Sequence, residues 1–157
     1  MEHDVIEQAH HQLTIATEGP GFADLTRPVA EWLAAIGAGD GLVTLFVRHT
    51  SASLTIQENA DPEVLRDLSE ALDRLAPRAA RYHHSLEGPD DMPAHIKSML
   101  TASSLGVPVL AGKAVLGTWQ AIYLIEHRDR PHSREVMLQY TGTLGTTSGG
   151  PERTIQN

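Results

Sequence analysis

The chain has 157 residues, of which 41% are apolar and 20% charged, and this composition is typical of one soluble globular domain. Because it contains no cysteine, disulfides and thiolate metal sites are excluded, and any metal site must use His and carboxylate ligands. The formal net charge of −8 argues against nucleic-acid binding, and the lack of a long apolar run or signal peptide predicts a cytoplasmic protein that binds no membrane.

The first third of the chain predicts a strand, a helix and a second strand. Residues 5–17 alternate loosely between apolar and polar side chains, which indicates a β-strand. Apolar residues at helical spacing predict a helix over residues 25–36, and Gly37 ends it. The continuous apolar run 42–47 predicts a strand buried on both faces, and the strand pattern resumes over residues 54–58.

A motif of small polar residues joins these last two strands. His49, Thr50, Ser51 and Ser53 follow the buried strand directly. Hydroxyls and unpaired backbone N–H groups at such a position can bind an anion. The alternative is a bulge or corner of the sheet that needs small residues because space is short. The local sequence leaves both interpretations open.

A second helix begins at Asp61, which precedes Pro62 and so provides an N-cap followed by proline at the first helical position. Pro77 ends it. Its outward charged residues indicate a solvated face, and its apolar residues recur at helical spacing. We therefore predict a buried stripe made of Val64, Leu65, Leu68, Leu72 and Leu75.

Residues 82–97 are the most unusual stretch of the chain. They contain three His, three carboxylates, one Lys and two Pro in sixteen positions, a mixture that cannot form a core. Asp91 is expected to cap a helix that has Pro93 in its first turn. Loop residue His84 and helix residue His95 then converge with the acidic turn on one metal ion or one anion.

The last part of the chain predicts three more strands. Residues 105–110 contain Pro108 and should form an edge or bulged strand. Gly117 precedes the buried strand 121–125 and suggests a bulge or a close approach of backbone to a ligand. Residues 135–140 give the final strand. We therefore predict a single domain over residues 1–140 and a mobile Gly/Thr/Ser-rich tail over residues 141–157.

Three motifs occur together in this order: His49-Thr50-Ser51-Ala52-Ser53-Leu54, the stretch from His84 to Lys97, and Gly117-Thr118-Trp119-Gln120 followed by Glu126-His127-Arg128. This combination resembles the YjbQ family, described as secondary thiamine-phosphate synthase enzymes. The resemblance implies an α+β fold: a compact, single-domain, β-sandwich-like sheet with two to three helices. It also implies a homotrimer with a His-bound metal ion that condenses a pyrimidine diphosphate with a thiazole phosphate, an activity regarded as weak.

Site residues are assigned from the motifs together with the resemblance. We expect His84, His95 and His127 to bind a divalent metal ion, since three imidazoles leave one coordination position open. Zinc is the expected ion, and Mg²⁺ is the alternative when a diphosphate substrate is bound. The catalytic candidates are His49, Glu87 and Asp91. Binding of a phosphorylated small molecule is assigned to Thr50, Ser51, Ser53, Lys97, Gly117, Thr118 and Gln120.

Two other functions fit the same residues. One is a non-catalytic, trimeric metal- or ligand-binding module, and the other is a metal-dependent hydrolase in which Glu87 or Asp91 activates water. The scaffold of a dedicated thiamine-phosphate synthase does not fit, because a (β/α)₈ barrel needs roughly 200 residues or more. Any such activity must therefore use a different fold.

Overall fold

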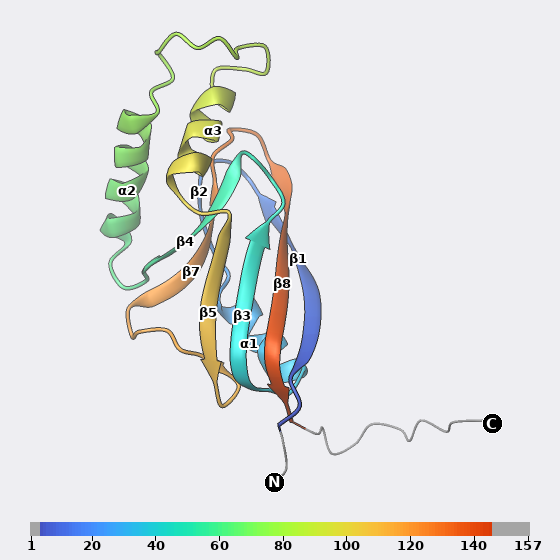
Figure 1. The fold of residues 1–157 in the computed structure, drawn as a ribbon. Coiled ribbons are helices and arrows are strands. Elements are labelled where there is room, and N and C mark those ends of the chain that lie inside the picture. The colour runs from blue at the N-terminus through green and yellow to red at the C-terminus, as the bar shows by residue number, and fades with distance from the viewer. Residues whose placement is uncertain (1–3, 146–157) are drawn as a thin grey trace, which may run out of the picture.

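The computed structural model describes residues 4–145, which form two antiparallel β-sheets and three helices (Figure 1). This confirms the predicted α+β fold class. No helix in the described part of the chain is long and apolar enough to cross a membrane. In chain order the elements are β1 (Glu7–Thr17), β2 (Gly21–Asp24), α1 (Thr26–Ala35), β3 (Ala38–Val47), β4 (Ala52–Glu58), α2 (Pro62–Leu75), α3 (Asp91–Leu100), β5 (Ser104–Leu110), β6 (Lys113–Ala114), β7 (Gln120–Glu126) and β8 (His132–Leu144).

The larger sheet has the strand order β1-β8-β3-β5-β6 and the smaller one the order β2-β7-β4. Strand β1 pairs with β8 along the whole length of β1, from Glu7 opposite Gly142 to Thr17 opposite His132. In the smaller sheet Ala52 lies opposite Glu126, so the start of β4 and the end of β7 meet at one corner. This register places the small-residue motif beside the residues that follow β7.

The core lies between the two sheets and α1. Strand β3 shows the alternation that sets its inner face, since Val43, Leu45 and Val47 are at most 2% exposed. From α1, Val29 and Leu33 pack into the same cluster. Helices α2 and α3 instead stand together at one end of the molecule, beside β4 (Figure 1). The end with α2 and α3 therefore carries the loop of residues 76–90 that precedes α3.

Two burial predictions were wrong. Strand 42–47 is not buried on both faces: Leu42 and Phe46 are 45% and 50% exposed, because no described element covers the outer face of the larger sheet. The apolar stripe of α2 is not buried either, since none of its residues is fully buried and Leu75 is 65% exposed. The spacing identified the helix correctly, but the depth of burial depends on what packs against it.

Two boundaries also differ from the prediction. Strand β8 continues through residues 141–144, which pair with β1 and β3, so the domain does not end at residue 140. Of the residues assigned to the tail, 146–157 lie outside the described part of the chain. The short strand β2, in which only four residues pair with β7, was not predicted.

Candidate functional site

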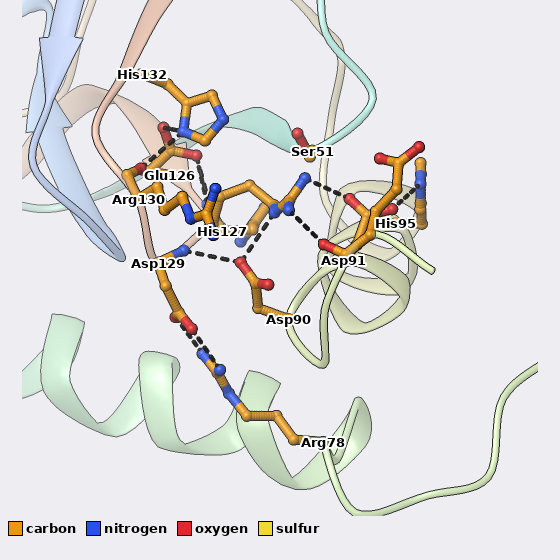
Figure 2. A network of polar contacts seen from close by, with 12 residues as sticks. Ser51, Arg78, Asp90, Asp91, His95, Glu126, His127, Asp129, Arg130 and His132 are labelled. Carbon is orange, nitrogen blue, oxygen red and sulfur yellow. Dashed lines mark hydrogen bonds and ion pairs between the residues drawn. The ribbon is translucent and has the colours of Figure 1, made fainter. Parts of the chain in front are cut away.

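Two imidazoles and one carboxylate converge where the 76–90 loop meets α3. Asp91 Oδ2 lies 2.5 Å from Nε2 of His84 and 3.2 Å from Nε2 of His95. His95 follows Asp91 by four residues, so both project from the same face of α3, as Figure 2 shows. One donor atom from each residue lies within 4.8 Å of the others. We call His84, Asp91 and His95 the cation group.

Asp91 does not cap α3 as predicted. Asp90 occupies the N-cap position without a side-chain capping bond, and Asp91 is the first helical residue. Its side chain is almost fully buried and accepts hydrogen bonds from His84 and from Arg128. Burial alone raises the pKa of Asp91, but the His84 hydrogen bond and the Arg128 charge outweigh it and hold this pKa below its usual value.

The donor chemistry of the cation group fits a transition-metal ion. Two imidazoles and one carboxylate are a ligand set that catalytic zinc sites use, and the same set binds non-haem Fe²⁺. The two His side chains are 43% and 36% exposed, so water or substrate can reach the group. Mg²⁺ fits less well because it prefers oxygen ligands.

His127 is not among the residues whose donor atoms lie within 4.8 Å of one another in the cation group. It is 4% exposed, and its Nε2 lies 2.8 Å from Oγ of Ser53. Ser53 in turn contacts the Thr101 hydroxyl at 2.6 Å. Burial, with a contribution from the Lys97 charge, lowers the pKa of His127 to about 4. Within one chain the fold therefore does not bring the three predicted His together. Asp91, and not His127, is the third member of the group with His84 and His95.

The buried His127 predicts a pH-dependent stability. Its folded pKa is below the unfolded value of 6.5, so below pH 6.5 the unfolded state binds more protons and stability falls as pH falls. We expect a loss of about 2 kcal/mol between pH 7 and pH 5 from this residue. Urea unfolding at both pH values should show it in the wild type and not in His127→Gln. An equal loss in both proteins would contradict the assignment, as would an NMR titration midpoint of His127 near 6.5.

A second polar site lies at the corner where β3 ends and β4 begins. A pocket of about 470 Å³ opens there, and it is lined by Phe46, Val47, Arg48, His49, Thr50, Ser51, Ser103 and Arg134. Among the described residues, no acceptor is found for the backbone N–H groups of residues 49–51. We call these eight lining residues the corner pocket. Its N–H groups, hydroxyls and basic side chains suit an anion.

His49 has a defined proton in the corner pocket. Its Nε2 accepts a hydrogen bond of 2.9 Å from the backbone N–H of Glu135, so the neutral ring carries its proton on Nδ1. Burial, followed by the charge of Arg134, lowers the pKa of His49 and favours this neutral form. His49 is thus held as a donor at Nδ1.

A buried ion pair between Arg134 and Glu126 lies beside the corner pocket. Arg134 and Glu126 are both 3% exposed, and Nη2 of Arg134 lies 2.5 Å from Oε2 of Glu126. The same Nη2 also donates to Oγ and O of Ser51. Thr17 adds a hydrogen bond of 2.5 Å to Glu126. Arg134 was not predicted as a site residue, although an arginine two residues before Val136 on one strand has the parity of a core position.

Other predicted binding residues are placed elsewhere in this chain. Lys97 is buried and pairs with Asp73 of α2 at 2.5 Å, and Ser53 is only 1% exposed. Glu87, which was predicted as a catalytic residue, lines a different pocket of about 520 Å³ beside Asp90 and Arg128.

The Gly117 motif lies at the far end of β7. Gly117 and Gln120 hydrogen-bond each other across a turn that contains Thr118, and the register of β7 with β4 is continuous. Of the two alternatives predicted for Gly117, the bulge is therefore wrong, and the close approach to a ligand stays a prediction. Gln120 begins β7 and Glu126 ends it, which separates this turn from the corner pocket by roughly 20 Å. Within one chain the two motifs therefore do not meet.

The family model for UPF0047 protein YjbQ-like matches residues 11–143. The chain belongs to this family. It is 50% identical to UPF0047 protein sll1880 of Synechocystis sp. over 84% of this chain and 90% of that protein. A crystal structure of the conserved hypothetical protein TT1486 from Thermus thermophilus is 42% identical, with a TM-score of 0.72 over 82% of this chain and 97% of that one.

The fold of the UPF0047 family is also seen at low identity. A YbjQ-like protein of unknown function from Sulfolobus solfataricus P2 superposes with a TM-score of 0.82 at 22% identity, over 88% of this chain and 99% of that one. This likeness supports the fold alone. This chain covers nearly the full length of each of these relatives, so the described domain corresponds to their whole fold.

Proposed function

We propose that the protein is a secondary thiamine-phosphate synthase that joins a pyrimidine diphosphate to a thiazole phosphate and releases diphosphate. The observation that carries this proposal is the corner pocket, whose eight lining residues offer hydrogen-bond donors and include no carboxylate. Arg48 pairs with Glu135 at 3.2 Å and Arg134 with Glu126, yet backbone N–H groups and hydroxyls remain available. Such a pocket supports anion binding in a protein that is acidic overall.

The reaction places its developing negative charge on the leaving diphosphate. Donors fixed beforehand around that charge stabilise the transition state more than the ground state. Nδ1–H of His49 and the N–H groups of residues 49–51 are oriented by the fold before substrate arrives. The Ser51 hydroxyl adds a further donor, since its oxygen already accepts from Arg134. Because the reaction needs no protein nucleophile, a pocket of donors is sufficient.

The cation group extends this proposal. His84, Asp91 and His95 would hold a divalent ion, with zinc the best match to the ligands. When bound, such an ion supplies positive charge that stabilises phosphate oxygens. We assign Asp91 as a ligand in place of the catalytic role predicted for it. Glu87 is kept as a catalytic candidate beside the cation group, because Arg128 binds both its backbone carbonyl and the Asp91 carboxylate.

Assembly into a homotrimer is part of the same proposal. The outer face of the larger sheet exposes Leu42, Phe46 and Leu110, which are 45%, 50% and 57% exposed. Phe46 also lines the corner pocket, so a subunit covering this face would help to close the pocket. Light scattering should give about three times the chain mass of 17.0 kDa. A monomer at micromolar concentration would reject the trimer.

The activity test uses both purified precursors and measures thiamine phosphate directly. The wild type should form it, and His49→Ala should be slower by roughly 100-fold because one preorganised donor is lost. Glu31→Ala is the control, since the Glu31 side chain is 62% exposed on α1 and Glu31 is not among the residues that line the pocket. Equal rates for the wild type and His49→Ala would overturn the proposal. Phosphate release without thiamine phosphate would favour the hydrolase.

A further inference from the structure

We propose that Arg128 is a positioning residue that orients Asp91 within the cation group. The proposal deepens the function proposed above and rests on it. Arg128 donates from Nη1 to Oδ1 of Asp91 at 2.6 Å, while Oδ2 of Asp91 faces His84 and His95. The two carboxylate oxygens are therefore divided: one is held by the guanidinium and the other is presented to the imidazoles.

Arg128 is itself held from two sides. Its Nε donates to Oδ2 of Asp90 at 2.9 Å, and its Nη2 donates to the backbone carbonyl of Glu87 at 3.1 Å. Its backbone N–H donates to the buried carboxylate of Glu126 at 3.2 Å. The side chain of Arg128 is only 17% exposed. Both the backbone and the guanidinium are thus fixed before any ion binds.

The planar guanidinium is needed for this arrangement. Three of its N–H groups reach three different acceptors: the carboxylates of neighbouring residues Asp90 and Asp91 and the carbonyl of Glu87. A lysine ammonium is a single point charge on a flexible stem and cannot span all three. The contact to Glu87 also anchors the 76–90 loop that carries His84. Arg128 therefore fixes two of the three ligands, Asp91 directly and His84 through its loop.

A neighbouring ion pair at the same corner provides a matched control. Arg78 makes a bidentate contact with Asp129, and the backbone N–H of Asp129 donates to Asp90 (Figure 2). Within the described residues, Arg78 forms no ion pair with Asp91. Arg78→Lys replaces the guanidinium of a similar ion pair on the same loop, and no member of the cation group loses a contact.

The experiment compares wild type, Arg128→Lys and Arg78→Lys by Co²⁺ titration, following the visible absorption of the bound ion. Arg128→Lys keeps the charge and should weaken Co²⁺ binding by about 10- to 100-fold and change the absorption band, because the carboxylate is no longer oriented. Arg78→Lys should bind within about twofold of the wild type. Thermal unfolding without Co²⁺ is measured on all three proteins. Asp90→Ala, which removes the acceptor of Arg128 Nε, should weaken binding in the same direction and replaces Arg128→Lys if that variant does not fold.

The outcomes separate this proposal from the function it rests on. Wild-type affinity and an unchanged band in Arg128→Lys, with the wild type binding Co²⁺, would overturn the positioning role alone. A wild type that takes up no Co²⁺ would overturn the cation group and with it the positioning role, whereas the reaction proposed at the corner pocket is decided by the thiamine phosphate assay. If Arg78→Lys loses as much affinity as Arg128→Lys, in step with thermal stability, the effect is general loosening of the corner and the positioning role is wrong.

Discussion

Replacing His84, Asp91 or His95 by alanine should lower zinc affinity by about 100-fold or more, whereas His127→Ala should leave it within a few-fold of the wild type. Loss of a supporting residue around a metal costs roughly 10- to 100-fold, so loss of a direct ligand costs at least the upper end of that range. The three group members place donor atoms within 4.8 Å of one another. His127 instead bonds Ser53 in the interior.

The measurement is a competition titration with a chromophoric chelator, supported by elemental analysis after dialysis. His83→Ala is the matched control, because His83 is exposed and adjacent to His84 but is not a member of the group. Loss of zinc in His127→Ala as large as in His95→Ala would restore the three-His set predicted from the sequence. Full affinity in all of the variants would mean that no ion binds at the cation group.

The sequence predicted the elements of this fold better than their surroundings. The Asp61-Pro62 start of α2 is a local signal, and Asp61 does accept a hydrogen bond from the backbone N–H of Glu63 at 2.9 Å. Burial of α2 is not local, because it depends on which surface lies against the helix. That surface is limited in this chain, and the predicted stripe remains partly exposed.

At the candidate site, too, features local in sequence were predicted better than contacts between distant segments. His84 and His95 were predicted together because a loop and a helix start lie close in sequence, and the fold brings them together. The role of His127 depends on the pairing of β4 with β7, which puts Ser53 opposite Ile125 and within reach of the ring. Asp91 was predicted as a cap from its position. Its contact with His84 fits the predicted convergence of the two His with the acidic turn, whereas its contact with Arg128 comes from a distant segment that no local pattern reports.

The buried ion pair links the two polar sites. Glu126 accepts from the backbone N–H groups of His127 and Arg128, and so sets the corner that leads to the cation group. Arg134 holds Ser51 in the corner pocket. One pair therefore supports both sites, and its loss should affect the fold before it affects either site alone.

Removing one partner of this pair should strongly destabilise the fold. We expect Glu126→Gln and Arg134→Met each to lower the free energy of unfolding by about 3–5 kcal/mol, because each leaves a buried group without its partner. The double variant should lose less than the sum of the two. Burial raises the pKa of Glu126, but hydrogen bonds from Arg134 and Thr17 outweigh it and lower this pKa. The stabilisation is therefore present above the unfolded pKa of 4.5 and is lost as pH falls through the lower folded value.

Urea unfolding at pH 7 measures these changes, and the exposed pair between Arg48 and Glu135 supplies the control. Its side chains are 54% and 40% exposed, so Glu135→Gln should cost less than about 1 kcal/mol. Repeating the unfolding between about pH 5 and pH 3 should show a smaller acid-induced loss in Glu126→Gln than in the wild type, because the titrating carboxyl is gone. If Glu126→Gln costs no more than Glu135→Gln, the pair does not stabilise the corner, and neither polar site depends on it.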